Sequence, residues 1–164
     1  MNNEALNKAI ASLKFTDVFI TKSTSSLSED FDPKFDARSD RLSFQTKNFV
    51  TASAIFEGES EDGPLQLFRV TSELGIRIIC KDDVEEGNDE PEVLAQVEAT
   101  MEADYTISDA SIAENQEALD EFALKNVSYH VWPYWREYVT SQLLRMNMPK
   151  LVLPMLLRAS NQEQ

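Results

Sequence analysis

Two long segments of alternating apolar and polar residues constrain the fold of this chain more than any other feature. Between Phe68 and Ile78 the aliphatic and aromatic side chains all have even numbers, and from Val93 to Ile107 apolar residues return at the odd numbers. Successive side chains of a strand point to opposite faces, so both segments predict half-buried antiparallel strands. At about 3.3 Å per residue the second strand would span roughly 50 Å, more than a small core needs. Strands of this length favour pairing with a partner across an edge or a face.

Two further strands are expected upstream. Residues 13–22 are rich in β-branched and aromatic side chains, and residues 42–56 place such side chains among Thr and Ser, with an irregularity near Asn48. Residues 57–64 contain glycine and acidic residues but no apolar residue, which predicts a hairpin turn. The remaining connections are predicted to be loops over residues 23–40 and 81–91.

The pattern changes at Ser111, where helices are expected to begin. Ser111 and Glu114 have the spacing of a capping box, in which each would bind the backbone N–H of the other, so a first helix should start there and end near Asn126. Pro133 suits the first position of a second helix, because a proline lacks the N–H that has no partner there anyway. This second helix is predicted to run to about Met146.

These elements predict one domain of the α+β class. A chain of 164 residues can bury about two thirds of its unfolded surface, so its core needs no disulfide or metal. We expect an antiparallel sheet within residues 13–108, helices within 111–147 and a tail over 148–164. A short amphipathic helix is also expected at residues 3–12.

The net charge of −14 bears on partners and location. An acidic surface repels phosphate backbones, so nucleic acid is not an expected partner, whereas basic polypeptides would be attracted. Solubility alone is an equally good explanation of the charge. The N-terminus lacks the basic start and apolar run of a signal peptide, and no segment has the length of a membrane span. With a single cysteine, these features predict a cytoplasmic protein that does not insert into membranes.

The sequence offers little for catalysis. Its glycines are scattered without the spacing of a phosphate-binding loop, and the acidic clusters lack the ligand spacing of a calcium loop. Cys80 and His130 are the only candidates for a nucleophile and base, but no motif surrounds them. A buried Cys80 and a packed or hydrogen-bonded His130 are the simpler interpretations. We therefore expect that this protein is not an enzyme and binds no cofactor.

The C-terminal third carries a family resemblance. The string from Tyr129 to Glu137 reads YHVWPYWRE, and after one helix the string from Met148 to Pro154 reads MPKLVLP. Together they resemble the SecB family of export chaperones, in which an aliphatic-Phe-Pro-Tyr-Ala-Arg-Glu stretch is followed by Phe-Pro-x-Leu-x-Leu-x-Pro. The order of sheet and helices also resembles that family.

The resemblance implies both architecture and function. It implies a Greek-key antiparallel sheet of about four strands with the helices packed on one face, assembled as a homotetramer built from two dimers. Members bind unfolded polypeptides and preproteins in apolar grooves without ATP, and export members deliver them to SecA through an acidic sheet face. Glu98 matches an acidic position of that face. The chain departs from the family at Ser23, where an acidic residue is expected, at Trp132, which replaces Phe, and after Pro154.

Two functions follow, an export holdase that delivers clients to SecA and a partner-specific chaperone, for example of a toxin–antitoxin system. In either case aromatic and methionine side chains can line an adaptable groove, although the same residues can equally be ordinary core. The predicted client-binding residues are Phe44, Phe49, Trp132, Trp135, Leu143 and Met146.

Overall fold

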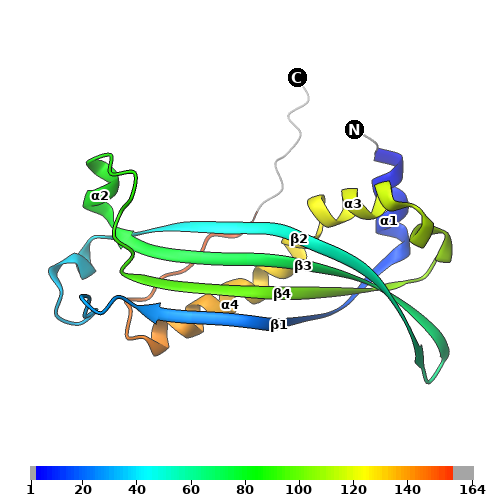
Figure 1. Cartoon of the computed structure of the whole chain (residues 1–164), viewed down its shortest axis with the longest axis horizontal. Coiled ribbons are helices and arrows are strands. Elements are labelled where there is room, and N and C mark those ends of the chain that lie inside the picture. The colour runs from blue at the N-terminus through cyan, green and yellow to red at the C-terminus, as the bar shows by residue number, and fades with distance from the viewer. Residues whose placement is uncertain (1–2, 157–164) are drawn as a thin grey trace.

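The computed structural model describes residues 3–156, and its centre is one four-stranded antiparallel sheet (Figure 1). The strands are β1 (Leu13–Leu27), β2 (Leu42–Ser60), β3 (Gly63–Cys80) and β4 (Ala95–Ile107), in the spatial order β1-β4-β3-β2. Strands β2, β3 and β4 follow one another as neighbours, while β1 lies beside β4, which is a Greek-key arrangement. The predicted α+β class and four-stranded antiparallel sheet are confirmed.

Helices cover one face of this sheet and leave the other uncovered (Figure 1). Helix α4 (Val127–Arg145) crosses the covered face, whereas α1 (Asn3–Ser12) and α3 (Gln116–Lys125) lie at one end. The short helix α2 (Lys81–Glu85) and the connection between β1 and β2, with its 3-10 turn η1 (Ala37–Asp40), lie at the other end. None of the helices in the described part of the chain is both long and apolar enough to cross a bilayer.

The predicted alternation places the core between α4 and the sheet. Odd-numbered residues of β4 from Ala95 to Tyr105 are at most 5% exposed, and the even-numbered apolar residues of β3 from Phe68 to Ile78 are at most 1% exposed. From α4, Trp135, Val139 and Leu143 pack into the same core. The covered face is therefore apolar, and the uncovered face carries the polar positions of both strands.

Two strand boundaries and the position of one irregularity differ from the prediction. β1 continues to Leu27, because its Ser- and Thr-rich second half pairs with β4 in spite of weak strand propensity. The β2–β3 turn is tighter than residues 57–64, since Ser60 already pairs with Gly63. The irregularity in β2 lies between Val50 and Ala52 and not at Asn48.

The helix starts also differ. The capping box does not form: residues 110–114 make the 3-10 turn η2 (Ala110–Glu114), and the Asn115 side chain accepts from the Ala118 N–H to cap α3. Helix α4 begins at Val127, so Pro133 lies inside it. Burial of Val127 and Val131 explains the early start, because its favourable free energy offsets the loss of the helical hydrogen bond that proline removes. The predicted tail beyond residue 156 lies outside the described residues.

Candidate functional site

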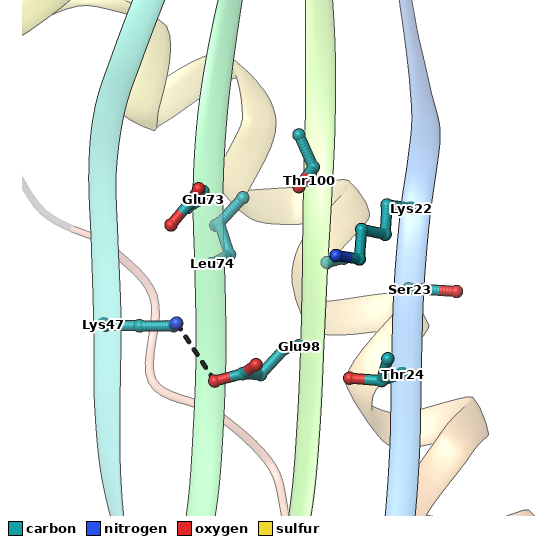
Figure 2. Close-up of a pocket in the computed structure, with 9 residues that line it drawn as sticks. Lys22, Ser23, Thr24, Lys47, Glu73, Leu74, Glu98 and Thr100 are labelled. Atoms are coloured by element: carbon teal, nitrogen blue, oxygen red, sulfur yellow. Dashed lines mark ion pairs between the residues drawn. The ribbon is translucent and has the colours of Figure 1, made fainter.

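The uncovered face of the sheet, here called the open face, carries a polar site around Glu98. Lys47 of β2 extends across Gly75 of β3, and its Nζ lies 3.0 Å from Oε1 of Glu98 on β4 (Figure 2). Gly75 makes this crossing possible, since a Cβ at that position would lie 2.7 Å from Cε of Lys47. The ion pair thus joins β2 to β4 over a glycine on the strand between them.

Two shallow cavities of about 170 and 350 Å³ adjoin this ion pair. Lys22, Thr24 and Glu73 line the smaller one (Figure 2). Lys47 lowers the pKa of Glu98 from its ordinary value, and the charge of Lys22 acts in the same direction. Glu98 is therefore ionised at neutral pH, but its charge is already paired.

The open face is not acidic as a whole. By strand register it carries five basic and five acidic side chains, which are Lys14, Lys22, Lys47, Arg69 and Arg77 against Asp17, Glu73, Glu98, Glu102 and Asp104. The acidic sheet face implied by the family resemblance is therefore replaced here by a face of balanced charge, in a chain whose net charge is −14.

Much of the negative charge lies at one end of the sheet, in residues 28–41 and 81–92, here called the acidic end. These residues include twelve acidic and four basic side chains. Arg41 joins the two segments through Asp82 and Glu85, and Arg38 joins them through Glu92. The surplus of carboxylates suits a basic partner.

A cavity of about 480 Å³ lies between the acidic end and the end of α4. Leu27, Phe31 and Met146 supply apolar lining, and the carboxylate residues Glu29, Asp30 and Asp32 also line it. Phe35 of the same connection is 80% exposed. Apolar side chains beside carboxylates can hold an apolar side chain of a partner next to a basic one.

The structure does not bring the six predicted client-binding residues together. Trp135 and Leu143 are 0% and 2% exposed in the core, so neither side chain offers a surface to a client in this arrangement. Trp132 is 7% exposed, and its Nε1 donates to the carbonyl oxygen of Pro154 at 2.9 Å. Phe44 is partly buried against the core, while Phe49 is 47% exposed on the open face.

Met146 also packs partly against the core, at the cavity of the acidic end. Client contact by these residues stays a prediction, and it rests on Phe44, Phe49 and Met146, whose side chains keep exposed surface.

A second cluster on the open face was missed by the sequence analysis. Arg69 donates from Nε and Nη2 to the two carboxylate oxygens of Asp104, at 2.7 and 2.8 Å. Its guanidinium also stacks on Phe19 and Phe56, 4.9 and 5.0 Å from their ring centroids. Strand alternation indicates that Arg69 faces outward, but only the register of all four strands reveals these partners.

Cys80 and His130 lie far apart. His130 Nδ1 is 2.8 Å from the hydroxyl of Tyr105, whose burial raises its pKa. Tyr105 pairs with Phe68, 12 residues along β3 from Cys80, which corresponds to about 40 Å. The two residues therefore do not form a nucleophile–base pair in this arrangement.

The chain was compared with protein families, curated proteins and solved structures. No protein-family model matches the chain, and no curated protein matches it. Among solved structures, it is similar to the SecB-like chaperone Rv1957 of Mycobacterium tuberculosis, solved in complex with a ChAD peptide from the Rv1956 HigA1 antitoxin. The TM-score is 0.64 at 17% identity, and the match covers 95% of this chain and 99% of the other. The chain has a SecB-like fold.

Replacing Glu98 by Gln is expected to remove a pH-dependent part of the stability. Because the pKa of Glu98 is lowered in the folded chain, the ion pair stabilises the fold at neutral pH and loses this effect as the pH falls through the lowered pKa. For so exposed a pair we expect about 0.2–1 kcal/mol. Urea unfolding should show this difference between wild type and variant at neutral pH, and no difference well below the pKa of Glu98. An equal difference at both pH values would contradict it.

Proposed function

We propose that this protein is an ATP-independent chaperone that binds segments of non-native polypeptides. The observation that carries the proposal is the cavity at the acidic end, where Leu27, Phe31 and Met146 lie beside the carboxylate residues Glu29, Asp30 and Asp32, on a SecB-like fold. Burying several hundred Å² of a client at about 25 cal/mol per Å² offsets much of the entropy lost in holding a flexible chain. The carboxylates attract basic client segments and keep the complex soluble.

The proposed mechanism contains no chemical step and no cofactor. The separation of Cys80 from His130 supports this view, and so does the hydrogen bond between Tyr105 and His130. A free cysteine suits a reducing compartment, so we propose the cytoplasm as the location.

A partner-specific chaperone is a better fit than delivery to SecA. The balanced charge of the open face supports this choice, because it lacks the excess of carboxylates that the SecB resemblance implies for SecA docking. Ser23 also departs from the acidic residue that the resemblance implies for SecA docking. The SecB-like neighbour, solved with a peptide from an antitoxin, is consistent with a dedicated partner of this kind.

We also propose that the chain assembles into a homotetramer. Exposed apolar side chains on α4 and the segment after it support this assembly: Tyr134, Leu144, Val152 and Met155 are 48%, 56%, 60% and 68% exposed. Such surface is typical of protein contacts. Light scattering that finds a stable monomer would contradict the assembly.

The function is tested by aggregation of a chemically unfolded client diluted into buffer without ATP. The purified protein should suppress light scattering by the client at about one tetramer per client chain, and added salt should weaken the effect because it screens the carboxylates. No suppression at this ratio would overturn the proposal. A matched titration with SecA should show no binding, and a pull-down should yield one dominant partner. Binding to SecA would instead favour the export holdase.

A further inference from the structure

The hairpin that joins β2 to β3 extends past the ends of the other two strands (Figure 1). β4 pairs with β3 only as far as Leu67, so residues 57–66 form a two-stranded ribbon without a third strand within residues 3–156. This ribbon, with Phe56 and Leu67 at its base, is here called the arm. A two-stranded hairpin is marginally stable by itself in water, so the arm would gain stability from contact with another element.

Of the four glycines of the chain, only Gly58 of the arm has no role in the fold. Gly63 and Gly87 have φ angles of 117° and 72°, which favour glycine, and Gly75 lies beneath the side chain of Lys47. Gly58 has no positive φ angle, and a Cβ there would meet no atom of the described residues within 4 Å. Glycine weakens a strand interior, and it often occurs where another molecule approaches the backbone closely. Gly58 therefore indicates a contact surface on the arm.

The open face of the arm is apolar around this glycine. Phe56 pairs with Leu67 and Gly58 pairs with Leu65, so these four residues share one face. Phe56 is 48% exposed and the two leucines are half-buried. The missing side chain at Gly58 therefore leaves a recess between Phe56 and Leu65, which an apolar side chain of a partner can fill.

Carboxylates border this apolar face. Glu57 and Glu59 lie on the opposite face of the arm, and Glu61 and Asp62 lie in its turn. Residues 57–66 contain no basic side chain. Two arms placed against each other would bring two such sets of carboxylates together, which disfavours a second copy as the occupant. A basic partner is favoured instead, because long Lys and Arg side chains can make apolar contact and still reach the carboxylates.

The dimensions of this face suit an α-helix. Residues 56–60 of β2 span about 13 Å at about 3.3 Å per residue, and the face is two strands wide, with the strands about 5 Å apart. A helix has a diameter of about 10 Å and rises about 5.4 Å per turn, so roughly two to three turns would cover the face.

We propose that the arm docks a basic amphipathic helix of a folded partner protein, and that an apolar side chain of this helix fills the recess above Gly58. Basic side chains at the borders of the helix then reach Glu57, Glu59 and the turn of the arm. The arm and the cavity of the acidic end lie at opposite ends of the sheet (Figure 1). The inference therefore adds a docking site that is separate from the proposed chaperone function.

The test uses two stapled helical peptides of about twelve residues with the full-length protein. Both carry leucines at positions i, i+3, i+4 and i+7, and the borders of this stripe are lysine in the first peptide and glutamate in the second. The first should bind roughly tenfold more tightly at low salt, and added salt should reduce the difference. Hydrogen exchange of the complex should show new protection at the amides of residues 55–67.

The variant Gly58→Val distinguishes docking from folding. Valine favours a strand and has room at this position, so the variant should melt no lower than wild type. It fills the recess, so it should bind the first peptide roughly tenfold more weakly. Ser53→Val, at an exposed position on the other face of β2, is the matched control and should bind normally. Glu59→Gln/Glu61→Gln/Asp62→Asn should weaken binding at low salt and change it little at high salt.

Equal binding by wild type and Gly58→Val, equal binding of the two peptides, or no binding of either would each overturn the inference. Concentration-dependent protection of the arm without peptide would also overturn it, and would identify a second copy as the occupant.

Aggregation assays separate this inference from the chaperone function, because Gly58→Val should suppress client aggregation as wild type does. A folded Gly58→Val that loses this suppression would show that the arm binds clients, which removes the separate docking site and leaves the chaperone function standing. Wild type that binds the first peptide but suppresses no aggregation would leave the docking site standing and remove the chaperone function.

Discussion

Replacing Trp135 with alanine is expected to lower the free energy of unfolding by about 3–5 kcal/mol. Its indole is 0% exposed between α4 and the sheet, and alanine would leave a cavity that the neighbouring side chains cannot fill completely. Chemical denaturation followed by circular dichroism measures the effect. A loss of this size can unfold much of a marginally stable chain, so the purified variant should show a lower melting temperature or aggregate.

Two variants serve as controls for this prediction. Trp135→Phe should cost much less, because it keeps most of the volume and removes an Nε1 donor that is buried without a hydrogen-bond partner in the described residues. Phe49→Ala, on the open face, should change the free energy of unfolding by less than about 1 kcal/mol. It should instead weaken the suppression of client aggregation. A well-folded Trp135→Ala that no longer suppresses aggregation would show that Trp135 contacts clients, as the sequence analysis predicted.

The second large effect is expected from Asp104→Ala, which should lower the free energy of unfolding by about 1–3 kcal/mol. The carboxylate side chain is only 8% exposed and binds Arg69 through both oxygens. Its loss leaves the guanidinium without its carboxylate partner, between Phe19 and Phe56. The 32% exposure of the Arg69 side chain keeps the cost below that of a fully buried charge.

A double variant distinguishes loss of the pair from loss of packing. Arg69→Met/Asp104→Leu removes both charges and keeps apolar contact with the two phenylalanines, so it should be more stable than Asp104→Ala. Glu102→Ala is the matched single control on the same strand, because Glu102 accepts one hydrogen bond from Thr71 and should cost less than about 1 kcal/mol. Equal stability of Asp104→Ala and wild type would show that the pair contributes nothing.

The sequence predicted the parts of this fold that depend on local periodicity. Alternation over β3 and β4 identified which residues face the core, since side chains of a strand change face at every residue. Local capping chemistry was less reliable. Ser111 and Glu114 have the spacing of a capping box, but the side chains of Asp109 and Asn115 cap η2 and α3 instead.

The candidate site was only partly predictable. Glu98 was identified from the family resemblance, but its neutralisation by Lys47 depends on a strand register that brings Gly75 between them. The exposed Phe49 and the buried Trp135 are both aromatic residues in amphipathic segments. Sequence alone does not distinguish them, because their burial depends on what packs against each segment.

The sequence by itself therefore determined the four strands, the main helices, the core-facing positions of β3 and β4 and the excess of acidic residues, but it predicted a loop where the short helix α2 forms. Only the tertiary structure decided which residues meet: the pairing of Arg69 with Asp104, the joining of residues 28–41 and 81–92 into one acidic end, and the position of β2 at an uncovered edge. The physical reason is that a period of two specifies the face of a strand but not its neighbour. The neighbour depends on contacts between residues far apart in the chain, whose free energy is available only once the whole sheet has formed.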